Sequence, residues 1–358
     1  MPAMKLLILF GGLSNEHEVS RVSAASIVRN ADKEKYELVT VGITKDGRWL
    51  LYEDADPEKM ASGAWEQEAT IPAMLAPDRG IHGIVALRGG KAEAVRIDCC
   101  FPVLHGFGGE DGSVQGLLTL AGIPFVGPGV AASADSMDKS LTKVIVDRAG
   151  VKQAAYSVAL RPDFQNDPDG VMRRAMDTLK SFPVFIKPCS SGSSVGVHKA
   201  TDADSLREGL AEAFRWDEKV LVEEFIAGRE VEVAVLGNHA PRASIAGEIA
   251  PTQEFYTYDA KYNDDSSALY IPARIPEEAM EAVRQNALRV FAAMGCRGLS
   301  RVDFFCTFED NEIIFNEINT IPGFTSISMY PKLFAHEGIS YPALIDALVE
   351  LALEGRHG

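Results

Sequence analysis

The chain has 358 residues, of which 46% are apolar, and its 35 basic and 51 acidic side chains leave a net charge of −16. This length predicts two or three compact domains with a substantial core. The negative charge argues against nucleic acid or an anionic membrane as a partner.

Cysteine usage and the first residues indicate the compartment. The five cysteines are an odd number without the spacing of a metal site, which is typical of reduced thiols in a cytoplasmic protein. The first apolar run, Leu6–Phe10, is too short for a signal peptide or a membrane span.

A βα unit opens the chain. Lys5–Phe10 is a continuous apolar strand of the kind buried in a parallel sheet, and a helix is predicted over Ser20–Ala31. The loop between them, GGLSNEHEVS, lacks the G-x-G-x-x-G spacing of a dinucleotide site. Glu16 in this loop can offer a charge to a small ligand, whereas capping of the helix by Ser14 or Asn15 would require no function.

A second glycine-rich loop follows a later buried strand. After a strand at Leu38–Ile43, residues 44–95 hold hairpin-like turns and are predicted to elaborate the same domain. Cys99–Leu104 is the next buried strand, HGFGGEDG starts directly after it at His105, and a helix follows over Val114–Leu120. Ligands in open α/β sheets bind at the carboxyl ends of strands, and glycines let the backbone approach a substrate closely.

The middle of the chain carries signals for phosphate. A helix is predicted over Ala131–Ala149 and bears Lys139, and the strand Phe182–Lys187 ends in a lysine that precedes the loop PCSSGSSVG. The N–H groups of such a loop can surround phosphate oxygens while Lys187 supplies positive charge. No G-K-[ST] follows, so this is not a Walker A sequence, and an isolated Gly/Ser loop is more often a linker.

Two acidic residues end the next strand. Val220–Ile226 alternates into Glu223 and Glu224, and Val231–Leu236 is a further strand. A strand that ends in acidic residues between two domains suits an adenine and ribose site. We therefore place a domain boundary near Val222.

A long polar stretch follows. Pro251–Pro272 contains four tyrosines, and a loop of this length in a compact domain is usually functional or disordered. Its aromatic content argues against disorder. We interpret it as a lid with Lys261 and Tyr262 near its tip, followed by an amphipathic helix over Glu277–Met294.

The strongest chemical signal is a predicted hairpin of the strands Ser300–Thr307 and Ile313–Ile318. Its turn places Asp303 opposite Glu317, and two facing carboxylates repel each other unless a cation lies between them. Oxygen ligands suit magnesium and phosphate chemistry. A solvated polar face beside an apolar core is the alternative.

Further polar groups converge on the same hairpin. Arg301 shares a face with the first carboxylate, and Asn319 shares one with the second. The turn that follows brings the N–H of Gly323 toward the same place. A closing helix is predicted over Tyr341–Glu354.

Together these stretches resemble the ATP-grasp superfamily and, within it, the D-alanine:D-alanine ligases. The resemblance runs from GGLSNEHEVS to TSISMYPKL, and residues 44–95 look like an insertion present in part of the family. Family members vary at Cys189, so this thiol is not expected to be catalytic. The supporting stretches, in order, are HGFGGEDG, SMDKSLTK, KPCSSGSSVGV, VLVEEFIAGREVEVAV, EFYTYDAKY, RVDFF and FNEINTIPGFTSISM.

The resemblance implies an α/β fold of the ATP-grasp type with three domains. Residues 1–127 would form an N-terminal Rossmann-like substrate domain, 128–222 the central ATP-grasp domain, and 223–358 the C-terminal one with the metal site and the lid loop 251–272. ATP would bind between the last two. The implied activity is ATP-dependent ligation of two D-alanines through an acyl phosphate, for peptidoglycan precursor synthesis in the cytoplasm.

The resemblance also implies roles for single residues. Acidic and amide oxygens would bind two Mg²⁺ (or Mn²⁺), with Glu317 bridging, and other groups would hold ATP, form the oxyanion hole and bind D-alanine. The metal ligands would be Asp303, Glu317 and Asn319; the ATP-binding residues Lys139, Lys187, Glu223, Ile226, Glu230 and Lys261; the catalytic residues Glu16, Ser193, Tyr262, Arg301 and Gly323; and the substrate-binding residues His105, Ser328 and Met329. Among these, Arg301 and the Gly323 N–H would form the oxyanion hole, and Ser193 and Tyr262 would link Glu16 to the lid.

A homodimer and activation by K⁺ are suggested by the resemblance alone. Two other functions stay open. Ligases that join D-alanine to D-lactate carry histidine at the position of Tyr262, so this chain favours the dipeptide. A regulatory module without chemistry would be expected to lack metal ligands or the oxyanion arginine, which are present here.

Overall fold

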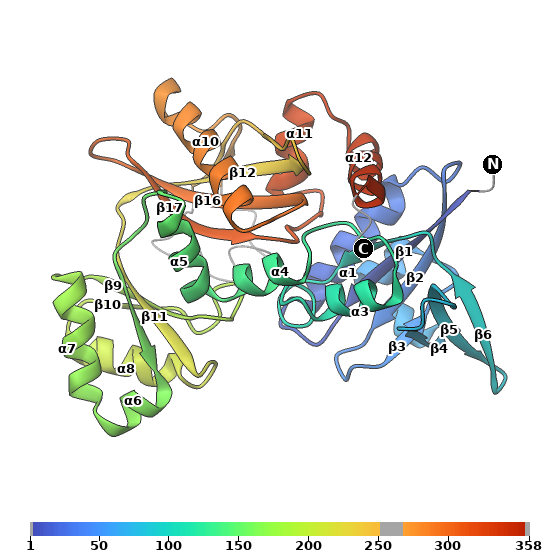
Figure 1. The fold of residues 1–358 in the computed structure, drawn as a ribbon, viewed down its shortest axis with the longest axis horizontal. Coiled ribbons are helices and arrows are strands. Elements are labelled where there is room, and N and C mark those ends of the chain that lie inside the picture. The colour runs from blue at the N-terminus through green and yellow to red at the C-terminus, as the bar shows by residue number, and fades with distance from the viewer. Residues whose placement is uncertain (1–2, 251–267, 355–358) are drawn as a thin grey trace.

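A computed structural model describes residues 3–250 and 268–354 (Figure 1). Within these residues the strands form three sheets, of seven, four and six strands. Helices cover the sheets, so the fold is mixed α/β, as expected. None of the helices described is both long and apolar enough to cross a membrane.

The first sheet has the order β6-β5-β4-β3-β2-β1-β7, and β1 pairs in parallel with both β2 and β7. β1 is buried from Leu6 onward because α1 and α12 cover one face and α3 covers the other. The antiparallel strands β3 to β6 form the predicted elaboration. Bounds are β1 Met4–Gly11, α1 His17–Asn30, β2 Tyr36–Ile43, β3 Trp49–Leu51, α2 Pro57–Ser62, the 3₁₀ helix η1 Ala64–Gln67, β4 Ile71–Leu75, β5 Gly83–Arg88, β6 Lys91–Arg96, β7 Cys99–Val103 and α3 Ser113–Ala121.

The start of α1 differs from the prediction. The helix begins at His17, three residues before Ser20, and its N-cap Glu16 makes no side-chain cap. Ser14 does not cap the helix; its hydroxyl donates to the carbonyl of His105 at 2.7 Å and accepts the N–H of Glu16 at 3.2 Å. The loop is therefore tied to the second glycine-rich loop, which lies at the end of the neighbouring strand β7.

The second sheet is antiparallel, in the order β10-β9-β11-β8, and its core contains side chains of α7 and α8. The boundary predicted near Val222 falls inside β11, so the change from the second to the third sheet comes after Glu224. Bounds are β8 Tyr156–Leu160, α6 Arg161–Asn166, α7 Pro168–Leu179, β9 Val184–Pro188, β10 His198–Ala200, α8 Ala203–Ala213 and β11 Lys219–Glu224.

The third sheet has the order β15-β14-β12-β16-β17, with β13 paired to β12. The predicted hairpin is β16 and β17, and the helix predicted to precede it is α10. Bounds are β12 Gly228–Gly237, β13 Arg242–Ala243, β14 Gly247–Ala250, β15 Ala268–Tyr270, α10 Glu277–Ala293, β16 Gly298–Thr307, β17 Ile313–Asn319, α11 Met329–His336 and α12 Tyr341–Glu354.

The continuous helix predicted over Ala131–Ala149 is wrong. Two helices, α4 (Val130–Met137) and α5 (Lys139–Arg148), are separated by Asp138, whose extended backbone and side chain cap α5. Ala132 and Val146 of this pair pack into the core of the third sheet, and Figure 1 shows α5 beside β17. The break puts Lys139 at the first position of α5.

The closing helix α12 returns to the first sheet. Its apolar side chains share a core with Leu6, Ile8 and Phe10 of β1. Asp346 of α12 accepts hydrogen bonds from Tyr36, at 2.8 Å, and from Lys35. The end of the chain therefore joins its first and third sheets.

Candidate active site

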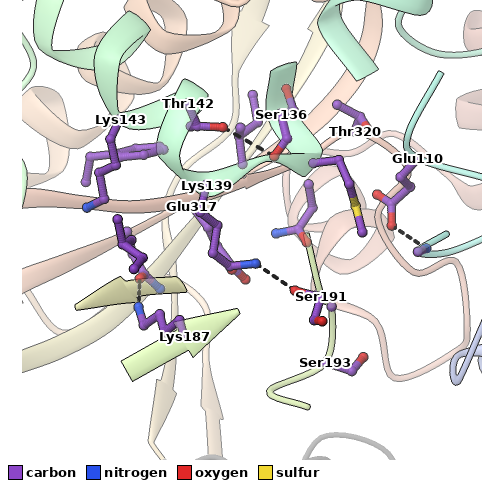
Figure 2. A pocket seen from close by; sticks show the side chains of 18 of the residues that line it. Glu110, Ser136, Lys139, Thr142, Lys143, Lys187, Ser191, Ser193, Glu317 and Thr320 are labelled. Atoms are coloured by element: carbon purple, nitrogen blue, oxygen red, sulfur yellow. Dashed lines mark hydrogen bonds between the residues drawn. The ribbon is translucent and has the colours of Figure 1, made fainter. Parts of the chain in front are cut away.

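Two cavities that share lining residues lie between the second and third sheets, and the smaller one also reaches the loops that follow β1 and β7. The larger, of about 900 Å³, is lined by residues from β9, β11, β12, β14 and β17, a size that suits a bound small molecule. The smaller, of about 60 Å³, is shown in Figure 2. Both include Lys139, Lys187, Ser193 and Glu317, and the smaller one extends to Glu16.

The hairpin pairing is confirmed. Asp303 lies opposite Glu317, and Arg301 lies opposite Asn319. Asp303 is buried and accepts two hydrogen bonds from Arg301, at 2.8 and 2.7 Å, and one from the Asn319 amide at 3.0 Å. The carboxylates that were expected to repel each other are thus partly balanced by a guanidinium.

A buried acid missed by the sequence analysis joins this group. Glu232 on β12 lies opposite Asp303, and its Oε2 is 3.2 Å from Nε of Arg301. Burial opposes the charge of Arg301, but the two carboxylates outweigh it and raise the pKa of the guanidinium well above its usual value. Arg301 therefore stays cationic. The alternation E-V-E-V of Glu230–Val233 in β12 was the available signal.

Lys187 and Glu223 form a buried ion pair with a third member, Lys143. Each oxygen of Glu223 meets one ammonium, Lys187 at 2.7 Å and Lys143 on the other side. Burial disfavours the Glu223 charge, but the lysines outweigh it and hold its pKa at about 2. Glu223 also raises the pKa of Lys187 against burial, whereas burial lowers the pKa of Lys143.

Lys143 was not predicted. It lies four residues after Lys139 on α5, so both ammonium groups project from one side of the helix toward the cavities, as Figure 2 shows. The motif SMDKSLTK contained this spacing. Ile226 and Glu230, the other predicted ATP contacts, line the larger cavity.

The Ser/Gly loop after β9 is anchored at several points. The ammonium of Lys139 donates to the carbonyl of Ser191 at 2.7 Å. The backbone N–H of Lys139 donates to the carbonyl of Cys189 at 3.0 Å. Ser193 and Ser194 have φ values of +50° and +59°, a region that non-glycine residues rarely adopt. The loop is thus held over the smaller cavity in a defined shape.

Glu16 binds this loop through a hydrogen bond. The Ser193 hydroxyl donates to Glu16 Oε1 at 2.5 Å across 177 positions of sequence. A Cβ on Gly106 or Gly192 would lie 2.7 or 2.6 Å from Glu16 Oε2 and would displace this carboxylate, and the φ of +67° at Gly106 also favours glycine. The predicted continuation of this link, Tyr262, lies outside the described residues, as does Lys261.

His105 is buried, contacts the turn after β17 and lines neither of the two cavities. Its Nδ1–H donates to the carbonyl of Ile321 at 2.9 Å. Burial lowers its pKa, so the ring is neutral at pH 7. Glu110, five residues further, accepts the N–H of Ile321 at 3.0 Å and was not predicted. In its motif, HGFGGEDG, only the glycines and His105 were given a role.

The last predicted group lies on the turn before α11. Ser328 is the N-cap of α11, and its Oγ accepts the N–H of Thr325 at 3.0 Å. A Cβ on Gly323 would lie 2.8 Å from that Oγ, so the two residues are in close contact. Met329 follows as the buried first residue of α11.

The cysteine thiols take no part in this site. All five are free and buried. Burial is the main cause that raises the pKa of the Cys189 thiol to about 12, which leaves it in the unreactive protonated form.

Within residues 3–250 and 268–354, no cluster of three or more His, Cys, Asp or Glu side chains is arranged to hold a metal ion. The predicted set contains two carboxylates and one amide, and one of these carboxylates is engaged by Arg301.

Comparisons with known proteins cover almost the whole chain. The family models described as D-ala D-ala ligase N-terminus and D-ala D-ala ligase C-terminus match residues 5–128 and 145–350. The D-alanine–D-alanine ligase of Acetivibrio thermocellus is 49% identical over 98% of this chain and 96% of its own. That of Caldicellulosiruptor bescii is 48% identical over 99% and 96%.

Two solved structures share the fold of this chain over almost its whole length. The VanG D-Ala:D-Ser ligase from Enterococcus faecalis has a TM-score of 0.88 and 36% identity, covering 98% of this chain and 99% of that one. The D-alanine-D-alanine ligase from Coxiella burnetii has a TM-score of 0.84 and 35% identity, covering 99% and 96%.

Proposed function

The chain belongs to the D-alanine–D-alanine ligase family of ATP-grasp enzymes, and we propose that it joins two D-alanines to D-alanyl-D-alanine with ATP, for peptidoglycan precursor synthesis. The observation that carries the proposal is that the two cavities share part of their lining. A large one suited to a nucleotide and a small one that reaches Glu16 share Lys139, Lys187 and Glu317.

The chemistry explains why such groups are needed. A carboxylate is a poor electrophile, so the γ-phosphoryl group of ATP is first transferred to D-alanine, giving ADP and an acyl phosphate. The amine of the second D-alanine, having lost a proton, then attacks the acyl carbon and phosphate leaves. Phosphoryl transfer depends mainly on positioning and on neutralising charge. We assign that task to Lys139 and Lys187, with Ile226 and Glu230 at the adenine and ribose.

Glu223 has a modified role in this proposal. Both of its oxygens meet ammonium groups, so we assign it first to holding Lys187 in place as a cation. The charged Lys187 then faces the phosphates. Any contact of Glu223 with the adenine would be additional to these ion pairs.

The residues present fit magnesium. Asp303, Glu317 and Asn319 offer hard oxygen ligands from one side of a hairpin where two carboxylates face each other. We propose that these residues would hold two ions, with Glu317 a ligand to both. The ions would supply positive charge to the phosphate oxygens of ATP.

Two donors are assigned to the tetrahedral intermediate. We propose that the guanidinium of Arg301 and the N–H of Gly323 stabilise its oxyanion, a contribution of about 3–4 kcal/mol for one such donor. The contacts of Arg301 with Asp303 use Nε and Nη2, which fixes the plane of the guanidinium. Glu16 would bind the ammonium of the first D-alanine, and Ser328, with Met329 beside it, the carboxylate of the second.

The decisive experiment measures phosphate release and product identity with ATP and D-alanine. D-serine and D-lactate are added in competition, because one relative in fold is a D-Ala:D-Ser ligase. We expect D-alanyl-D-alanine as the main product. ATP turnover without any ligated product would support the regulatory alternative, which the assembly of Arg301, Asp303 and Asn319 argues against.

A homodimer and activation by K⁺ rest on the resemblance alone. A cytoplasmic location and a domain division near residue 127 and near residue 222, the latter moved to the end of β11 at Glu224, rest on the sequence and the resemblance together. Light scattering of the purified protein tests the dimer, and exchange of K⁺ for Na⁺ in the ligation assay tests the activation.

A further inference from the structure

The peptide group of Ile321 is held on both sides by the first domain. Its N–H donates to Glu110 Oε1 at 3.0 Å, and its carbonyl accepts from His105 Nδ1 at 2.9 Å. Both partners belong to the glycine-rich loop after β7, more than 200 positions earlier in the chain. One peptide unit of the third domain is thus clamped by two side chains of the first.

A third contact lies on the far side of Gly323. The N–H of Phe324 donates to the hydroxyl of Ser23 on α1 at 3.2 Å, and that hydroxyl is 3.4 Å from His105 Nε2. The anchored groups therefore bracket Gly323, with Ile321 two positions before it and Phe324 one after. Pro322 between them has no N–H. Gly323 carries the one N–H between the two anchored N–H groups.

Glu110 is itself fixed. Its second oxygen accepts the N–H of Gly106 at 2.9 Å, so the carboxylate joins two backbone segments. Burial is the main cause that raises its pKa to about 7, and the nearby charge of Glu16 raises it further. The positive charge of Arg301 lowers the pKa of Glu110. A carboxyl group in such a place is less favourable for folding than a neutral side chain, which argues for a role in the reaction.

We propose that Glu110 is a positioning residue, which, with His105 and Ser23, holds the turn from Ile321 to Phe324 so that the N–H of Gly323 points at the developing oxyanion. This inference rests on the proposed function. Preorganised donors stabilise a transition state because they need not reorient during the reaction. Glu110 lines the smaller cavity, but each of its oxygens accepts a backbone N–H, so we assign it to holding the turn rather than to binding the substrate.

The test compares Glu110 with its neighbour. Asp111 also orders the glycine-rich loop, through the N–H groups of Gly108 at 2.8 Å and Ser113 at 2.9 Å, but these bonds stay within the loop. The matched pairs are Glu110→Ala with Asp111→Ala, and Glu110→Gln with Asp111→Asn. For each, kcat, the KM values for ATP and D-alanine, and the affinity for a tetrahedral phosphinate analogue of the dipeptide are measured.

We expect Glu110→Ala to lower kcat about 10- to 100-fold, as a small misplacement of a catalytic group does. Binding of the phosphinate should weaken by a similar factor, while the KM for ATP stays within about twofold. Glu110→Gln keeps one acceptor oxygen for Ile321 and should recover part of the loss. The Asp111 variants should change kcat by less than about threefold.

The proposal would be overturned if the Glu110 and Asp111 variants lowered kcat by the same factor. It would also be overturned if Glu110→Ala lowered kcat without weakening the binding of the phosphinate. If Glu110→Ala does not fold, the comparison of Glu110→Gln with Asp111→Asn decides. A wild-type protein that makes no dipeptide would instead overturn the proposed function, so the two failures can be told apart.

Discussion

The ammonium of Lys187 lies 2.7 Å from one carboxylate oxygen of Glu223, and the buried ammonium of Lys143 meets the other. The two buried ammonium groups would repel each other, and the carboxylate of Glu223 between them offsets this repulsion. Removing one member of a buried charge network leaves an uncompensated charge, which costs about 3–5 kcal/mol.

Glu223→Gln should therefore lower the free energy of unfolding at pH 7 by about 3–5 kcal/mol. Because the pKa of Glu223 is held at about 2, below its unfolded value of 4.5, its contribution is present above pH 4.5 and disappears as the pH falls toward 2. Urea unfolding between pH 7 and 3 should show the difference from wild type shrinking with acidity. Adding Lys143→Met to Glu223→Gln should recover part of the loss at pH 7. A double variant no more stable than Glu223→Gln would contradict the charge argument.

Glu317→Gln should abolish ligation, with a loss of kcat of about 100-fold or more, while circular dichroism stays unchanged. The side chain is half-buried and lines both cavities, so we expect the uncharged amide to be accommodated without unfolding. Glu309→Gln, in the exposed turn of the same hairpin, is the control and should behave as wild type. Near-normal turnover by Glu317→Gln would refute the metal assignment.

Lys187→Ala should weaken binding of a non-hydrolysable ATP analogue by about 10-fold or more, as expected for a lost charge-assisted hydrogen bond. D-alanine binding should change little. Isothermal titration calorimetry measures both, with the exposed Lys180→Ala as the control. An unchanged nucleotide affinity together with a lower melting temperature would show that Lys187 is only structural.

Gly323→Ala should lower kcat about 10- to 100-fold and raise the KM for the second D-alanine, because the new Cβ would lie 2.8 Å from Ser328 Oγ and displace both groups. Gly129→Ala is the matched control, since a Cβ there meets nothing within 4 Å. Initial rates at varied D-alanine give both constants. A KM for the second D-alanine equal to that of the wild type would show that Ser328 does not bind this substrate.

Tyr262→His should increase the share of D-alanyl-D-lactate, most strongly at acidic pH. A protonated imidazole repels the ammonium of D-alanine but not the hydroxyl of D-lactate, whereas tyrosine with an ordinary pKa near 10 stays neutral. Product analysis across roughly pH 6 to 9 spans the titration of histidine. Wild-type protein that makes mainly the depsipeptide at neutral pH would disprove the assigned second substrate.

Local patterns in the sequence determined many of the strands, the long helices α10 and α12 and the pairing of the hairpin. Strand alternation and a four-residue turn were enough to place Asp303 opposite Glu317, since side chains alternate strictly along a strand. The same patterns contained signals that were not used. Asp138 is a helix N-cap that separates α4 from α5, and the Asp202–Ser205 capping box marks the start of α8.

Contacts between distant segments were decided by the tertiary structure alone. The Glu110–Ile321 and Glu16–Ser193 bonds join residues 211 and 177 positions apart, and no local period encodes such a distance. The order of the motifs indicated that the loops holding Glu16 and Glu110 are those of the ligase family. It did not indicate which side chain of a loop contacts which group of a distant segment. That choice depends on how three sheets pack, because burial leaves a polar group only the partners that the packing brings within reach.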